Sequence, residues 1–222
     1  MNWPSLILSL KLAVWTMVVL LPIGIVLSRQ LAWRRFPAKG LVEAALAMPL
    51  VLPPTVLGFY ILITLGGGSP IGQFYDAVLG RSLVFSFDGL LVASVIFNLP
   101  FVVLPMRRAF ESIPPEVREA AACCGMSAGR ILWRIELPMA WPGILSALVL
   151  TFAHTIGEFG VVLMVGGNIP GETETIAIAI YDRVQAFDNA AAGLMSAVLL
   201  IVALAAIGIT YAATSSVGRR NI

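Results

Sequence analysis

The stretch Glu119–Pro138, EAAACCGMSAGRILWRIELP, decides the fold, because it is the longest interval of the chain that is not apolar. Its spacing is Glu-Ala-Ala, three residues, Gly125, nine residues, and then Ile-x-Leu-Pro. The apolar segments on both sides are long enough to cross a bilayer, which takes about 20 helical residues. A polar helix–turn–helix inserted between such segments predicts a place where another protein binds.

Composition excludes an ordinary soluble domain. The chain has 222 residues, of which 59% are hydrophobic and 12% charged, and its mean hydropathy is +0.95. A soluble domain of this length cannot bury so much apolar surface. We therefore predict an all-α, polytopic membrane helix bundle in which residues 1–222 form a single transmembrane domain. The net charge of +2 gives no indication of a nucleic-acid partner.

Hydropathy predicts five transmembrane helices, or six if the stretch 70–88 contains a short extra span. The second span contains three prolines within six residues, so we expect it to be kinked or partly unwound. No cleavable signal peptide is predicted, since the first apolar run is long and continues into a basic segment. The predicted spans are about 5–28, 40–65, 89–106, 141–165 and 190–213.

Positive charges are distributed unequally between the two sides of the predicted bundle. The loop after span one, the insert 107–138 and the C-terminal tail hold eleven: Arg29, Arg34, Arg35, Lys39, Arg107, Arg108, Arg118, Arg130, Arg134, Arg219 and Arg220. The other two loops hold only Arg81 and Arg183. Because basic loops stay in the cytoplasm, we predict a cytoplasmic insert, an outside N-terminus and a cytoplasmic C-terminus.

Local signals divide the insert into two helices. Pro115 suits the first position of a helix, which should run to about Cys124. Gly125 then suits the left-handed position after that helix, and Ser127 can cap a second helix that leads toward Pro138. The alanines of the first helix and Gly125 have almost no side-chain bulk, so another protein's backbone can approach them closely.

The spacing of the insert resembles the signature of binding-protein-dependent importer permeases of the ATP-binding-cassette (ABC) class, with every signature position occupied. The resemblance implies that the short helix is a coupling helix seated in a cleft of a cytoplasmic ABC ATPase dimer. It implies that Glu119, Ala120, Ala121 and Gly125 face that ATPase. Cys123 and Cys124 are expected to be small fillers, because two ligands alone do not make a zinc site.

Further segments resemble the molybdate, tungstate and sulfate branch of these permeases. Leu52–Gly58 reads LPPTVLG, and the segments Gly157–Gly160 and Gly167–Thr173 are most similar to molybdate permeases. His154 departs from the pattern, since related chains often have Arg there, so no role is carried to it. The resemblance implies import of an oxyanion, molybdate first, across a bacterial inner membrane, with an extracytoplasmic molybdate-binding protein as partner. Tungstate and sulfate stay open.

The fourth span carries its polar side chains on one helical stripe. Thr151, His154, Thr155 and Glu158 are spaced i, i+3, i+4 and i+7. Ionisable groups at this depth face a bundle interior or a watery path. They therefore line a pore or gate, or else His154 and Glu158, one turn apart, satisfy each other or a neighbouring helix. An ionised Glu158 would repel an oxyanion, so Thr151 and Thr155 are the better candidates for transient contact, with Glu158 as a gate candidate.

We predict no catalytic residues, cofactor or metal in this chain. The glycine-rich segment Gly66–Ser69 lacks the Lys of a phosphate-binding loop, so ATP hydrolysis is assigned to a separate subunit. Five spans make a thin wall, so two copies should form the pathway in the lipid bilayer. A gradient-driven secondary transporter is the alternative, with His154 and Glu158 as its only support. For a membrane enzyme no nucleophile or cofactor constellation is present.

Overall fold

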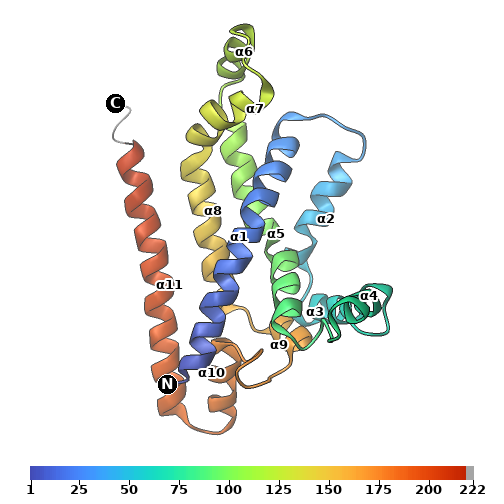
Figure 1. Ribbon diagram of the computed structural model, residues 1–222. Helices are drawn as coiled ribbons and strands as arrows, with labels where there is room; N and C mark the ends of the chain where they lie inside the picture. The colour runs from blue at the N-terminus through green and yellow to red at the C-terminus, as the bar shows by residue number, and fades with distance from the viewer. Residues whose placement is uncertain (219–222) are drawn as a thin grey trace.

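The computed structural model describes residues 1–218, and all regular structure within them is helical. The helices, coloured in chain order in Figure 1, are α1 (Trp3–Trp33), α2 (Lys39–Val51), α3 (Pro54–Leu65), α4 (Pro70–Leu79), α5 (Phe87–Glu111), α6 (Pro115–Cys123), α7 (Ala128–Ile131), the π-helix η1 (Leu132–Glu136), α8 (Leu137–Gly157), α9 (Gly160–Gly166), α10 (Ile176–Gln185) and α11 (Asn189–Gly218). The predicted all-α fold class is confirmed.

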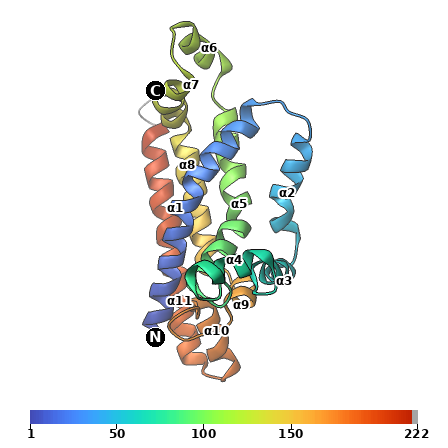
Figure 2. The ribbon, with the colours of Figure 1, turned by 45° about the vertical axis from the view of Figure 1, so that its right-hand side comes forward.

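Three long helices, α1, α5 and α8, pack against one another and form the centre of the bundle. Their shared core is apolar and fully buried, with Leu20 from α1, Phe110 from α5 and Ile144 from α8. Helix α11 packs along α8. Both ribbon views show α6 and α7 beyond one end of the bundle, while the N-terminus and α10 lie at the opposite end (Figures 1 and 2).

Within the described residues, four helices are long and apolar enough to cross a membrane, and a fifth span is counted if the bent pair α2–α3 is one span. The chain bends by 114° between the two helices of that pair. The predicted break is confirmed: α2 ends at Val51, and Pro53 precedes α3 with an extended backbone. Helix α4 has ten residues, which is too short for a sixth span within 70–88.

The fourth span differs from the predicted bounds of 141–165. Its helix begins in the insert at Ala128 and continues through η1 and α8 to Gly157. Pro138 does not separate two helices, because the π-turn absorbs it: the N–H of Leu137 donates to the carbonyl of Leu132, five residues back. The wider turn gives room to a proline that would clash with a carbonyl in a regular α-helix.

Capping residues and one ion-pair cluster position the segment between spans two and three. Ser69 caps α4 by accepting from the Gly72 N–H at 2.9 Å. The Tyr75 hydroxyl donates to the carboxylate of Asp88, which also accepts from Arg81. Burial, followed by the hydrogen bond to Asp88, raises the pKa of the Tyr75 hydroxyl above its usual value. These contacts fix α4 against the start of α5.

The elements that carry the predicted cytoplasmic charges share one end of the bundle. The last turn of α1, the start of α2, the end of α5, and helices α6 and α7 all lie there (Figure 1). The segment 166–189 lies at the other end with the N-terminus, where the Asn2 amide donates to Glu174 at 3.0 Å. Arg219 and Arg220 lie outside the described residues.

Candidate functional site

Helix α6 presents an exposed surface of small residues at the end of the bundle. Glu119, Ala120 and Gly125 are exposed, whereas Ala121 is 7% exposed and faces the chain itself. Gly125 has φ of 76°, as the sequence predicts, and the Met126 N–H donates to the Ala121 carbonyl at 3.1 Å. Three of the four predicted docking residues are thus exposed in or just after α6. We refer to Glu119, Ala120 and Gly125 as the docking surface.

One buried carboxylate joins α6 to the membrane helices. Glu136, the last residue of η1, is fully buried and accepts from Arg118 of α6 at 2.8 Å. It also accepts from Arg29 of α1, from Nε at 2.5 Å and from Nη2 at 3.2 Å. Arg118 in addition lies over the ring of Trp33, 3.9 Å from its centroid.

This arrangement makes Glu136 a junction of three elements. Two guanidinium groups compensate the charge that burial would otherwise make very costly. Because the carboxylate holds both Arg29 and Arg118, it connects α6 to α1 and to the helix that continues into α8. Spatially, the junction lies directly between the docking surface and the bundle.

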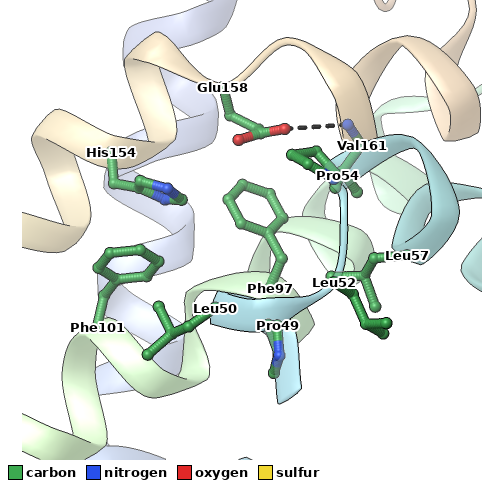
Figure 3. Close-up of a pocket in the computed structure, with 10 residues that line it drawn as sticks. All are labelled: Pro49, Leu50, Leu52, Pro54, Leu57, Phe97, Phe101, His154, Glu158 and Val161. Carbon is green, nitrogen blue, oxygen red and sulfur yellow. Dashed lines mark hydrogen bonds between the residues drawn. The ribbon is translucent and has the colours of Figure 1, made fainter. Parts of the chain in front are cut away.

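A second candidate site is an open cavity of about 200 Å³ between α2, α3, α5, α8 and α9. Its lining residues point toward one another in Figure 3, and most of them are apolar. His154 and Glu158 supply its only ionisable side chains. The lining consists of Pro49, Leu50, Leu52, Pro54, Leu57, Phe97, Phe101, His154, Glu158 and Val161.

The cavity lies where two interrupted spans meet. The chain leaves α8 at Gly157 and enters α9 at Gly160, just as it leaves α2 and enters α3 at Pro54. A Cβ atom on Gly160 would lie 2.8 Å from Cβ of Pro54, so the two breaks touch. Non-helical backbone at membrane depth is tolerated where it is enclosed by protein or lines a cavity. The junction of the two breaks is therefore the best candidate for a transport pathway.

Glu158 stabilises the break rather than pairing with His154. Its Oε1 accepts from the Val161 N–H at 3.0 Å, shown as a dashed line in Figure 3. The carboxylate thereby satisfies one of the free N–H groups at the start of α9. Its other oxygen has no hydrogen-bond partner among the described residues, and Glu158 lines the cavity.

His154 is held by α5. Its ring stacks on Phe101 with a centroid separation of 3.8 Å, and its Nδ1 lies 3.1 Å from Oδ1 of Asn98. Since an amide oxygen only accepts, Nδ1 carries the proton in this contact. The Asn98 amide nitrogen donates in turn to Thr155 Oγ1 at 3.0 Å. His154 thus belongs to a polar contact between two membrane helices.

The two predicted contact threonines lie behind the cavity. Thr151 and Thr155 are buried, at 0% and 3% exposure. Their hydroxyls donate to backbone carbonyls one turn earlier, at 2.9 Å to Ala147 and 2.7 Å to Thr151. The structure therefore places His154 and Glu158 on the cavity, and Thr151 and Thr155 in the contact between α5 and α8. A pore role for the threonines stays a prediction.

Sequence reasoning missed the long-range partners. Asn98 lies 56 residues before His154, and Arg29 lies 107 residues before Glu136. One signal was available, because Glu136 is the only acidic residue between Glu119 and Glu158. A lone acid at the entrance of a membrane span predicts a basic partner. In the searched part of the chain, no three His, Cys, Asp or Glu residues come together in a way that could hold a metal ion.

Comparison with known proteins gives relatives named as molybdenum or sulfate transport permeases. The chain is 48% identical over 185 residues to the molybdenum transport system permease protein ModB of Azotobacter vinelandii, covering 83% of this chain and 82% of that protein. It is 39% identical to the protein of the same name from Haemophilus influenzae, covering 80% and 78%. A probable sulfate transport system permease of Chlorokybus atmophyticus is 30% identical, covering 82% and 63%.

Solved structures share the fold. An ABC transporter that imports the acidic polysaccharide alginate matches with a TM-score of 0.73 at 17% identity, covering 94% of this chain and 78% of that one. The MetNI methionine ABC transporter matches with a TM-score of 0.71 at 17% identity, covering 97% and 94%. The family model described as the inner membrane component of binding-protein-dependent transport systems matches residues 20–219. The chain belongs to this family of inner membrane transport components.

Proposed function

We propose that the chain is the transmembrane pore subunit of an ATP-driven molybdate importer. The observation that carries this proposal is the docking surface, in which one exposed carboxylate, Glu119, lies beside small exposed residues outside the membrane bundle. Family membership and relatives named as molybdenum transport permeases support the substrate. Because one relative is named as a sulfate permease, sulfate is an alternative oxyanion, and tungstate is a second alternative.

The coupling step uses the contacts described above. A cytoplasmic ABC ATPase dimer binds the docking surface of each copy, and closure of the ATPase dimer moves α6. Arg118 and Glu136 transmit that movement into α1 and α8. Because α8 ends beside the cavity at Glu158, the movement reaches the point where the two interrupted spans meet. Closing and opening at this point gives alternating access.

The pathway suits passage of an anion rather than tight binding. The cavity carries one carboxylate, one imidazole and apolar groups, while a fixed oxyanion site requires several N–H donors or arginines. We place selectivity in an extracytoplasmic molybdate-binding protein, which docks at the end of the bundle that holds the N-terminus and α10. Glu158 serves as a gate element, because its negative charge repels an oxyanion in the cavity. Thr151 and Thr155 contact the oxyanion only when α8 moves.

The assembly contains two copies of the chain in a bacterial inner membrane. A single bundle of four or five spans leaves the cavity at its own surface, and a two-fold partner closes the pathway. The N-terminus faces outward and the C-terminus faces the cytoplasm, as the positive charges indicate. Bilayer lipid covers the remaining exposed apolar faces.

Uptake by the reconstituted complex tests the proposal. Liposomes with the purified complex and its binding protein should accumulate molybdate only with internal ATP, and molybdate should be preferred over sulfate. Glu119→Lys should abolish both uptake and co-purification of the ATPase, because it reverses the charge on the docking surface. Glu172→Lys, an exposed position at the opposite end, should leave co-purification intact. Uptake without ATP that survives Glu119→Lys would instead indicate a secondary transporter.

A further inference from the structure

A cavity of about 400 Å³ lies beside the last turns of α1, at the end of the bundle that carries α6 and α7. It is separate from the cavity at Glu158 and shares no residue with it. Its lining combines three apolar side chains with three guanidinium groups: Ile25, Val26 and Leu132 with Arg29, Arg34 and Arg118.

The polarity of this cavity changes along the helix axis. On α1 the lining passes from Ile25 and Val26 through Arg29 to Arg34. At 1.5 Å per residue, these nine steps cover about 14 Å, close to half the roughly 30 Å hydrocarbon thickness of a bilayer. The apolar part therefore lies toward the membrane centre and the cationic part at its surface. This order matches the order of acyl chain and headgroup in a lipid.

The cationic part has more positive charge than the chain itself neutralises. Arg29 and Arg118 share the single carboxylate of Glu136. The guanidinium group of Arg34, just past the end of α1, has no hydrogen-bond or ion-pair partner among the described residues. Three guanidinium groups and one carboxylate leave two positive charges at the cavity.

The remaining polar lining also consists mainly of donors. The side-chain amide of Gln30 and the indole of Trp33 both line the cavity. The Trp33 Nε1–H is buried and has no acceptor among the described residues. A site with excess donors and excess positive charge recognises a group with several anionic oxygens, such as a phosphate.

We propose that this cavity binds one anionic phospholipid. Its phosphate contacts Arg34, with Arg29 and Arg118 alongside, and an acyl chain lies over Ile25, Val26 and Leu132. Basic pockets between membrane helices bind acidic headgroups in this way. Because Arg118 belongs to α6, the bound lipid also steadies the insert that carries the docking surface. The inference requires only a membrane-embedded chain, and it stands independently of the transported ion.

The test compares two neighbouring arginines. Arg34→Gln removes a charge that lines the cavity, and Arg35→Gln removes an equally exposed charge next to it that does not. Neither change affects the ion pairs of Glu136. The full chain, purified with the subunits that stay bound, is mixed with phosphatidylglycerol or phosphatidylcholine, and retained lipid is counted by native mass spectrometry.

We expect wild type and Arg35→Gln to retain one phosphatidylglycerol per chain in preference to phosphatidylcholine. Arg34→Gln should weaken that retention about fivefold, the usual contribution of one basic residue near an acidic membrane. Equal retention by all three proteins would overturn the proposal, as would equal retention of the two lipids. Displacement of the lipid by millimolar inorganic phosphate would show a free-anion site and would overturn the assignment to lipid.

Discussion

Glu136 is a charged residue that is fully buried at the end of a hydrophobic bundle. It is fully buried between Arg29 and Arg118, at a signature position that accepts any residue. Its hydrogen bonds connect η1 to α6, 18 residues away, and to α1, 107 residues away. At this scale the molecule depends on one carboxylate to hold a polar insert against a hydrophobic bundle.

Glu136→Gln should therefore destabilise the protein strongly. The amide keeps the size of the side chain but leaves two guanidinium groups without their counter-charge, an effect of about 3–5 kcal/mol. We expect the thermal unfolding midpoint in detergent to fall by about 10 °C. Thermal unfolding followed by fluorescence measures the change.

Glu111→Gln is the matched control for that substitution. Glu111 also pairs with an arginine, accepting from Arg107 at 2.7 Å, but its side chain is 40% exposed. An exposed ion pair contributes about 1 kcal/mol or less. Similar midpoints for the two variants would show that the buried pairing of Glu136 does not stabilise the fold.

At the residue scale, features set by neighbouring residues could be predicted from the sequence, whereas contacts between distant residues could not. The caps at Gly125 and Ser127 were predicted from local rules and are confirmed by φ of 76° and by the bond from the Arg130 N–H to Ser127 at 3.4 Å. The partners of Glu136 and His154 were not predicted, because they come from helices whose packing no local rule describes. Arg29 and Arg118 were used only to predict which loops face the cytoplasm.

At the scale of elements, the contact between the two interrupted spans decides the shape of the cavity. Gly160 lets α9 approach Pro54 so closely that a methyl group would lie 2.8 Å from the proline ring. Both breaks line the same cavity, one through Leu52 and Pro54 and the other through Glu158. The two breaks therefore form one structural unit.

Gly160→Ala should impair transport without detaching the ATPase. The added methyl group must push α9 away from Pro54, and overpacking of this kind costs about 1–3 kcal/mol. We expect the rate of ATP-driven uptake in liposomes to fall at least tenfold, while co-purification of the ATPase is unchanged.

Gly157→Ala controls for the chemistry of that substitution. A Cβ atom on Gly157 meets nothing within 4 Å, and alanine favours the helix that this residue ends. Uptake by this variant should match wild type. If both alanine variants transport normally, the close approach of the two breaks has no part in the transport cycle.

The sequence indicated one of these breaks more clearly than the other. Three prolines marked the interruption at Pro53, because proline removes backbone hydrogen bonds in a predictable place. The interruption at Glu158 has no proline, and periodicity carried the predicted span on to residue 165. Gly160 was the available signal, since a residue without a side chain permits the close approach to Pro54.

For the whole molecule, the ends of the bundle differ in charge and in exposed chemistry. The N-terminus and α10 lie at one end, and α6 and α7 at the other (Figures 1 and 2). The number of spans followed from hydropathy, and their orientation is predicted from charge. Neither hydropathy nor charge predicted how the helices pack, because helices with apolar side chains on all faces have no periodic pattern of polarity.

Labelling of the two native cysteines tests the predicted orientation of the chain in the membrane. Cys123 and Cys124 are free and exposed on the α6 side, and the chain has no others. A membrane-impermeant maleimide should label them in inside-out vesicles but not in intact spheroplasts. A cysteine-free chain carrying Glu172→Cys should show the opposite pattern. Labelling of Cys123 and Cys124 in spheroplasts would reverse the predicted orientation.

The π-turn η1 determines the direction in which the docking surface points. An α-helix rotates about 100° per residue, so the additional residue in a π-turn offsets everything before Leu132 by a similar angle around α8. Deleting one residue from this segment would turn α6 toward a different side of the bundle and leave every membrane span in place. The number of residues in the segment sets the direction of α6, while the identity of one of them, Glu136, holds α6 against α1.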